Sequence, residues 1–286
     1  MAQLALKGGN KLITNPFPVY NSIGKEEKDA AIAVLESGAL SKFFGSWGDR
    51  FYGGPRVQEL ERNWEKHFKV RHAVSFNSWT SGLVAAVGAI GIEPGDEVIV
   101  SPWTMAASAS AILAWNGIPV FADIEEETFN LDPVSIEKNI TPYTKAILVP
   151  DIFGHPANLD AIMQIAEKYK LLVIEDTAQA PNSSYKGRYT GTVGHIGGYS
   201  LNYHKHIHTG EGGVAVTNND DFAERMRLIR NHAEAVVGPK GVTDLSNMIG
   251  YNLRLGEIEA AMANEQLKKL PPLTRMRSET GQMLSD

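Results

Sequence analysis

The sequence predicts an α/β protein in which a mostly parallel sheet is covered by helices on both faces. Helical patterns, among them 80–91, 105–117 and 159–170, separate most of the predicted strands. Strands that alternate with helices and are apolar along nearly their whole length are typical of a parallel sheet buried on both faces. Seven short runs of apolar, β-branched residues carry this prediction, at 72–76, 97–101, 119–123, 146–150, 171–176, 197–202 and 212–217.

The segments outside these strands are predicted from their amphipathicity and their glycines. The segment 41–55 is rich in glycine and aromatic residues and is expected to form a loop, as is 238–256. The polar tail 271–286 does not resemble a strand. Amphipathic patterns predict four further helices, at 25–38, 57–70, 220–234 and 257–270.

The composition excludes several classes of function. A net charge of −6 over 286 residues argues against a nucleic-acid-binding surface, which needs clustered basic residues. The absence of cysteine excludes disulfides, a thiolate nucleophile and a Cys-ligated zinc site. The sequence contains no apolar stretch of about 18 residues and no signal-peptide core, so we expect a cytoplasmic protein that does not bind membranes.

The segment 199–217 holds the residues from which a function is predicted. Lys205 stands five residues after Ser200 and just before the glycine-rich turn 210–213. Upstream, the run 171–180 reads as a buried strand that ends in the carboxylate of Asp176. This set suits pyridoxal phosphate: the lysine forms the Schiff base, the aspartate pairs with the pyridine nitrogen, and the serine contacts the phosphate. The combination predicts a pyridoxal-phosphate protein.

A phosphate seat is predicted where the first strand runs into a helix. The turn contains Ser78, Thr80 and Ser81, and the free N–H groups at a helix N-terminus bind anions well. The same hydroxyls also suit a purely structural role as helix caps. Asp176 likewise fits as the cap of a helix beginning near Thr177, and a lysine such as Lys205 is usually an exposed surface residue. Only the joint pattern favours the cofactor.

Three histidines, His204, His206 and His208, alternate with Lys205 and Ile207 and offer a second interpretation. On an extended chain they share one face, which could hold a metal ion. No carboxylate precedes Glu211 in this segment, so we expect histidines that face solvent or substrate and no metal site. Two nucleotide motifs are absent: the phosphate loop with its Gly-Lys pair, and the dinucleotide fingerprint of glycines opening a helix.

From about Val19 to Leu270 the chain resembles the DegT–StrS family of nucleotide-sugar aminotransferases, which have the fold-type I architecture. The resemblance implies a seven-stranded large domain and a homodimer that builds each active site across its interface. The matching blocks are GIEPGDEVIVSPWT, PVFADIEEETFNLDP, ITPYTKAILV, VIEDTAQA, YKGRYTGTVGHIGGYSLNYHK, HTGEGGVAVTNNDDFAERMRLIRNH and GYNLRLGEIEAAMANEQL.

The resemblance also implies roles for individual residues. Lys205 and Asp176 keep the roles given above. Gln179 lies against the cofactor ring or its 3′ oxygen, and Asn252 reaches the phosphate bound by the neighbouring subunit. The phosphate contacts are expected from Trp79, Thr80 and Ser200.

The chain departs from the family pattern in three places. Met105 replaces the aromatic residue that stacks on the cofactor ring, and Trp103 is the nearest aromatic substitute. Pro150–Asp151 replaces a Val-His pair. Family members continue for roughly another hundred residues into a small C-terminal domain. We therefore expect an N-terminal segment, a large pyridoxal-phosphate-binding domain and the first helix of a truncated C-terminal domain, at 1–30, 31–250 and 251–286.

The expected reaction moves an amino group from glutamate, or a similar donor, to a keto sugar, with a nucleotide as the expected carrier, in the biosynthesis of amino sugars and surface polysaccharides. Lys205 is both the covalent anchor and the general base. Two alternatives stay open. The first is a pyridoxal-phosphate-dependent sugar dehydratase, since some relatives of this kind have histidine at the lysine position. The second is a truncated, catalytically silent binding module. Metal-dependent hydrolysis by the three histidines is the least favoured.

Overall fold

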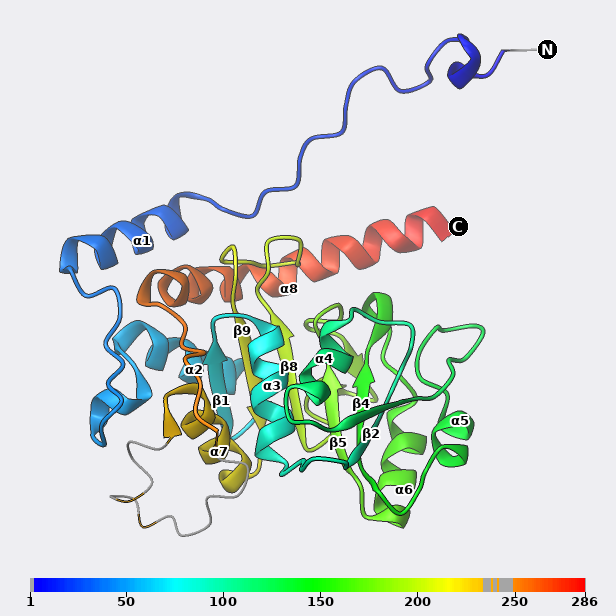
Figure 1. The fold of residues 1–286 in the computed structure, drawn as a ribbon. Coiled ribbons are helices and arrows are strands. Elements are labelled where there is room, and N and C mark those ends of the chain that lie inside the picture. The colour runs from blue at the N-terminus through cyan, green and yellow to red at the C-terminus, as the bar shows by residue number, and fades with distance from the viewer. Residues whose placement is uncertain (1–2, 234–237, 239–240, 242–248, 286) are drawn as a thin grey trace.

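A seven-stranded sheet in the order β1-β9-β8-β5-β4-β2-β3 forms the centre of the protein (Figure 1). The computed structural model describes residues 3–233, 238, 241 and 249–285. The strands are His72–Phe76 (β1), Glu97–Val100 (β2), Ile118–Phe121 (β3), Thr144–Pro150 (β4), Leu172–Asp176 (β5), Ile196–Ser200 (β8) and Gly213–Thr217 (β9). Each of the seven predicted strands is confirmed within a few residues.

Only β9 runs against the other strands. It pairs antiparallel with β8 and with β1, whereas β2, β3, β4, β5 and β8 pair in parallel. The connection 201–212 between β8 and β9 contains no helix, and the chain turns back beside the strand it has just left. A small hairpin of Ser184–Tyr185 (β6) and Arg188–Tyr189 (β7) was not predicted.

Helices cover both faces of the sheet, as predicted. The α-helices are Lys25–Ser37 (α1), Pro55–Phe68 (α2), Trp79–Ala89 (α3), Ala107–Leu113 (α4), Pro133–Lys138 (α5), Leu159–Tyr169 (α6), Asp220–Arg230 (α7) and Glu257–Ser285 (α8). Short 3₁₀ turns lie at Ala5–Lys7, Asp49–Tyr52 and Ile152–Gly154 within the described part of the chain. Residue 234 of the predicted helix 220–234, and parts of the predicted loop 238–256, fall outside the described residues.

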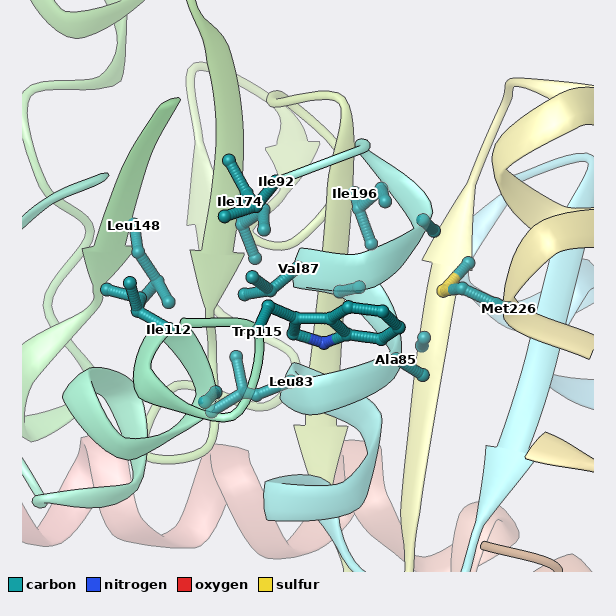
Figure 2. Packing of buried hydrophobic residues seen from close by; sticks show 14 of the residues in the cluster. Leu83, Ala85, Val87, Ile92, Ile112, Trp115, Leu148, Ile174, Ile196 and Met226 are labelled. Carbon is teal, nitrogen blue, oxygen red and sulfur yellow. The ribbon is translucent and has the colours of Figure 1, made fainter. Parts of the chain in front are cut away.

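Alternate residues of each strand point into different layers of the core. On one face, β-strand residues such as Leu148 and Ile174 pack against α3, α4 and α7. Figure 2 shows this layer, with Trp115 lying across α3 beside Val87. On the other face, α2 and α8 cover β1, β8 and β9, and α5 and α6 cover β2, β4 and β5.

The prediction that the last helix ends at residue 270 is wrong. Helix α8 continues through Pro271 and Pro272 to Ser285, although each proline removes a backbone donor. The hydroxyl of Thr274, just after the prolines, donates to the carbonyls of Leu270 and Pro271. None of the described helices is long and apolar enough to cross a membrane.

A buried ion pair joins α2, α7 and the edge strand β1. The Arg230 guanidinium, which is fully buried, donates to the Glu61 carboxylate at 2.6 Å and to the Ser75 carbonyl at 3.0 Å. Glu61 also accepts the Ser75 backbone N–H at 2.9 Å. This carboxylate therefore satisfies an open donor of the sheet edge while it neutralises the arginine.

Replacing Glu61 with glutamine should lower the free energy of unfolding by about 3–5 kcal/mol, because Arg230 is left buried without its counter-charge. The glutamine oxygen can still accept the Ser75 N–H, so the loss reports on the charge. Adding Arg230→Met to this variant should recover much of the stability. Urea unfolding of the two single variants and the double variant measures the coupling. A loss of stability in the double variant that equals the sum of the two single losses would show that the pair is not coupled.

Candidate active site

One cavity of about 330 Å³ lies at the carboxyl ends of the parallel strands, where ligands gather in open α/β sheets. Its volume falls in the usual range of ligand pockets, roughly 300–1,000 Å³. It brings together seven of the eight predicted site residues: Trp79, Thr80, Met105, Asp176, Gln179, Ser200 and Lys205. Asn252 does not line it.

Asp176 ends strand β5 and is held by side chains from two helices. One carboxylate oxygen accepts the Trp79 indole N–H at 2.7 Å, and the other accepts the Ser108 hydroxyl at 2.9 Å. Ser108 was missed by the sequence analysis, because a serine in a helix of small residues carries no signal of its own. The alternative interpretation of Asp176 as a helix cap is wrong. The segment after Asp176 forms a turn, and no helix begins at Thr177.

Two glycines allow α3 to approach the sheet closely enough for this contact. A Cβ on Gly198 would lie 2.0 Å from the Trp79 ring, and one on Gly213 would lie 2.5 Å from the Trp79 nitrogen. Any larger residue at either place would displace the helix start. Gly213, the last glycine of the 210–213 turn, thus allows Trp79 to lie close to the sheet. Trp79 in turn orients the carboxylate of Asp176.

The N-terminus of α3 opens on the cavity. Ser78 caps the helix by accepting the Ser81 N–H at 3.1 Å, so its structural role is confirmed. The cap leaves the Trp79 and Thr80 N–H groups at the positive end of the helix dipole. Ser200, at the end of β8, lines the same cavity. This end of the cavity is therefore suited to an anion such as a phosphate.

Lys205 extends from a turn between β8 and β9 into the cavity. Burial lowers the pKa of its ammonium group, and the negative charge of Asp176 acts in the opposite direction. A lowered lysine pKa increases the fraction of neutral amine, the form that attacks a carbonyl carbon. The structure thus places a nucleophilic amine and a fixed carboxylate around one cavity, with an anion seat beside them.

The other predicted residues take varied positions. Gln179 lines the cavity, and its side-chain oxygen accepts the Phe153 N–H at 2.9 Å. Met105 lines the mouth and is 73% exposed. Trp103, the suggested aromatic substitute, does not line the cavity. Asn252 is exposed and accepts a hydrogen bond from Arg254 at 2.9 Å.

The expectation of three histidines on one face of an extended chain is wrong, because residues 203–207 form a turn. His204 lines the cavity. Burial, together with the charges of Arg277 and Lys205, lowers the pKa of His206 to about 4. The His208 backbone N–H donates to Gln266. Among the described residues no group of three or more His, Asp or Glu side chains could hold a metal ion.

Two further carboxyl groups lie beside Asp176. Glu175 is fully buried and accepts three backbone N–H groups, from Gly191, Val193 and Gly194. Asp151 is 1% exposed, accepts only the Ala157 N–H through one oxygen, and has no partner for the other in the described structure. Burial and the charges of Glu175 and Asp176 raise its pKa well above the ordinary value. Burial without a counter-charge thus disfavours the ionised form of Asp151.

The sheet order, the single antiparallel strand and the arrangement of Lys205 and Asp176 define a protein of the fold-type I aminotransferase class. The DegT/DnrJ/EryC1/StrS aminotransferase family matches residues 22–286. The chain belongs to this family. The resemblance drawn from the sequence blocks is therefore confirmed.

Two relatives illustrate the range of the family. The chain is 36% identical to the spore coat polysaccharide biosynthesis protein SpsC of Bacillus subtilis, over 90% of this chain and 65% of that protein. It is 33% identical to the L-glutamine:2-deoxy-scyllo-inosose aminotransferase of Streptoalloteichus tenebrarius, over 99% of this chain and 67% of that enzyme. The chain thus spans about two thirds of the length of these relatives.

Solved structures support the same fold. An aminotransferase from Psychrobacter cryohalolentis superposes with a TM-score of 0.80 at 34% identity, over 90% of this chain and 65% of that one. A GDP-4-keto-6-deoxymannose-3-dehydratase with a trapped PLP–glutamate geminal diamine gives 0.78 at 27% identity, over 90% and 69%. The fold is therefore shared by enzymes with two different reactions.

Replacing Asp151 with asparagine should stabilise the protein at neutral pH and have little effect at pH 4. A carboxyl whose pKa is raised by folding binds its proton more tightly in the folded state, so stability falls as the pH rises from about 3.9 to the raised pKa. The asparagine removes this loss, which amounts to about 1.4 kcal/mol for each unit of the shift.

Thermal unfolding of the cofactor-free chain between pH 4 and pH 8 measures the effect. Glu127→Gln, which neutralises an exposed carboxylate in the loop after β3, is the matched control. A stability difference between Asp151→Asn and the parent that does not grow with pH would show that Asp151 is ionised in the folded protein.

Proposed function

We propose that this chain is the cofactor-binding part of a pyridoxal-phosphate-dependent aminotransferase that transfers an amino group to a keto sugar. The observation that carries the proposal is the meeting of Lys205, Asp176 and the N-terminus of α3 around one cavity. These groups fit the aldehyde, ring nitrogen and phosphate of pyridoxal phosphate. When bound, this cofactor supplies an electron sink for the carbanion formed at the amino donor.

Lys205 has two tasks in this proposal. Its amine, with a pKa lowered by burial, is the covalent anchor for the cofactor aldehyde. Once released by the amino donor, the same amine would accept the proton of the donor's α-carbon and return it to the carbon of the cofactor aldehyde. Lys205 lies in the connection between β8 and β9 and lines the cavity, so one side chain is available for both tasks.

Asp176 keeps the ring nitrogen protonated. Its two oxygens are already oriented by Trp79 and Ser108, so the carboxylate does not have to reorganise when a cation binds beside it. Thr80, Ser200 and the free N–H groups of α3 are the proposed phosphate contacts. Gln179 is the proposed contact to the ring and Met105 the proposed packing partner of its face, since both residues line the cavity.

The substrates are proposed from the family. The donor is glutamate or a similar amino acid, and the name of the Streptoalloteichus relative makes glutamine the first alternative to test. The acceptor is a keto sugar in amino-sugar or surface-polysaccharide biosynthesis, in line with the name of the Bacillus relative. We also propose a homodimer, in which Asn252 of one subunit reaches the phosphate held by the other.

A sugar dehydratase is the second candidate, because His204 lines the cavity beside Lys205 and a dehydratase shares the fold. Aminotransfer is preferred, since Lys205 itself faces the cavity and supplies the amine that transamination requires. A silent binding module is the third candidate. It differs from the others in predicting cofactor binding without turnover.

Adding pyridoxal phosphate to the purified chain should produce a visible absorbance band that Lys205→Ala abolishes. Addition of glutamate or glutamine should bleach the band, because the donor displaces the lysine and completes the first half-reaction. Lys145→Ala, which removes a lysine whose side chain is 54% exposed, is the control and should keep the band.

The three candidates give different results in this experiment. A band that neither donor bleaches supports the silent module. Bleaching by glutamate, followed by loss of a sugar hydroxyl without net amination, supports the dehydratase. A band of equal intensity in Lys205→Ala would contradict the assignment of the anchor, and no band in the parent chain would contradict cofactor binding.

A further inference from the structure

The turn that carries Lys205 is held from outside the cavity by two segments that lie far apart in the sequence. Lys205 lines the cavity, and residues 203–207 around it form the turn. We call residues 203–209, between β8 and β9, the lysine loop. Tyr20, ahead of α1, and Gln266, in α8, both contact this loop without lining the cavity. Figure 1 shows α8 passing beside the connection between β8 and β9.

Gln266 is fully buried, and each of its hydrogen-bonding groups has a partner. Its side-chain oxygen accepts the His208 backbone N–H at 3.1 Å and the Ser22 hydroxyl at 2.7 Å. Its amide nitrogen donates to the Ser22 carbonyl at 3.0 Å and to the Glu27 carboxylate at 2.7 Å. A primary amide offers two donors and two acceptor sites, so this side chain is saturated. Gln266 therefore joins the start of α1, helix α8 and the lysine loop at one point.

An ion pair fixes the orientation of the Gln266 amide. Glu27 is 0% exposed and forms a salt bridge with Lys269 at 2.6 Å, and its other oxygen accepts the Gly24 N–H at 2.6 Å. Burial raises the pKa of this carboxyl, but the Lys269 ammonium and the Gly24 N–H outweigh this effect, so that the pKa lies below its ordinary value. An ionised carboxylate only accepts hydrogen bonds. The amide nitrogen of Gln266 therefore has to face Glu27, and the amide oxygen has to face the lysine loop.

Tyr20 makes the second contact with the lysine loop. Its hydroxyl donates to the His206 carbonyl at 2.6 Å. The Arg277 guanidinium lies over its ring, 5.0 Å from the centroid. The ring is thus held against α8 while the hydroxyl binds the residue that follows Lys205. Tyr20 is 45% exposed, so this hydroxyl is not part of the core.

The main chain is fixed on both sides of Lys205. After the lysine, the His206 carbonyl and the His208 N–H are bound by the two contacts described above. Between them, the Ile207 side chain is 1% exposed and belongs to the core cluster that includes α2 and α8. Before the lysine, the turn is closed by the Lys205 N–H, which donates to the Asn202 carbonyl at 2.9 Å. The direction of the lysine side chain into the cavity follows from these contacts.

We propose that Gln266 and Tyr20 are positioning residues, which hold the amine of Lys205 where the cofactor aldehyde has to reach it. This inference rests on the proposed function and extends it to two residues outside the cavity. In the anchoring step the amine nitrogen bonds to the aldehyde carbon and one water molecule leaves, so no oxidant or reductant is needed. A loop released from these contacts holds the amine in place for a smaller fraction of the time, and anchoring weakens by the same factor.

Tyr20→Phe tests the exposed contact, because it removes the hydroxyl and keeps the ring that lies against Arg277. In calorimetric titrations, pyridoxal phosphate should bind this variant about 2- to 10-fold more weakly than the parent, the effect of one hydrogen bond. Pyridoxamine phosphate, which has the same ring and phosphate but no aldehyde, should bind both chains equally. Tyr143→Phe, which removes the hydroxyl of a 66% exposed ring just before β4, is the matched control and should change neither affinity.

Gln266→Met tests the buried contact. Methionine has a similar length but no amide, so the His208 N–H, Ser22 and Glu27 each lose a partner. The affinity for pyridoxal phosphate should fall further than in Tyr20→Phe, and the affinity for pyridoxamine phosphate should stay that of the parent. The unfolding temperature should also fall, because buried polar groups are left unpaired. Stability alone therefore does not separate positioning from packing, whereas the comparison of the two ligands does.

The same two substitutions in a Lys205→Ala chain complete the test. Without an amine to position, both substitutions should leave the affinity for pyridoxal phosphate unchanged. A role in packing alone would weaken the binding of both ligands, and it would do so with and without the lysine.

Hydrogen exchange in the cofactor-free chain gives a readout that needs no ligand. The His208 amide donates to Gln266, so its exchange rate reports on this bond directly. Gln266→Met should raise the exchange rate at His208. Tyr20→Phe should raise the rates across the lysine loop about 2- to 10-fold, while strand β4 exchanges as in the parent.

Three results would overturn the proposal. The first is an affinity for pyridoxal phosphate that neither variant changes. The second is an equal loss for the two ligands, or a loss that persists in the Lys205→Ala chain, which would assign both residues to packing. The third is unchanged exchange at His208 in Gln266→Met. Binding of neither ligand by the parent chain would contradict the proposed function itself, and the positioning role with it.

Discussion

The carboxylate of Asp176 is the point at which the sheet and two helices meet. A carboxylate that is only 7% exposed is stable only when donors satisfy it, and here Trp79 from α3 and Ser108 from α4 do so. These bonds fix the start of α3 over the end of β5. They also leave the carboxylate oriented toward the cavity, so that one set of contacts serves both the packing and the site.

Three carboxyl groups crowd this end of the sheet, and each is stabilised differently. Glu175 receives three backbone N–H groups, Asp176 receives two side-chain donors, and burial raises the pKa of Asp151. Like charges in a poorly solvated region cannot all ionise without compensation. The raised pKa of Asp151 reduces the like charge that it adds beside the other two carboxyl groups.

The sequence indicated the parts of the structure that depend on local pattern. The strands were predictable because the buried runs are apolar along their length, and Lys205 and Asp176 because their spacing from Ser200 and from the strand end is distinctive. The role of Ser108 was not predictable, since its contact with Asp176 depends on where α4 packs. The passage of α8 through Pro271 and Pro272 was not predictable, because a proline in a helical pattern ordinarily ends or kinks the helix. The interpretation of His204, His206 and His208 as one face was wrong, because it required an extended chain and this segment forms a turn.

The two halves of the candidate site are built by different means. The groups assigned to the cofactor come from strand ends and a helix start, where glycines such as Gly198 permit contacts too close for any other residue. The rim beyond these groups comes from loops, two of which are tied together by one buried amide, Asn130. Loops tolerate substitution where close-packed elements do not. A scaffold of this kind can keep its strand-end groups while the loops at its edge vary, and the fold is therefore more informative about the former than about the ligand that meets the loops.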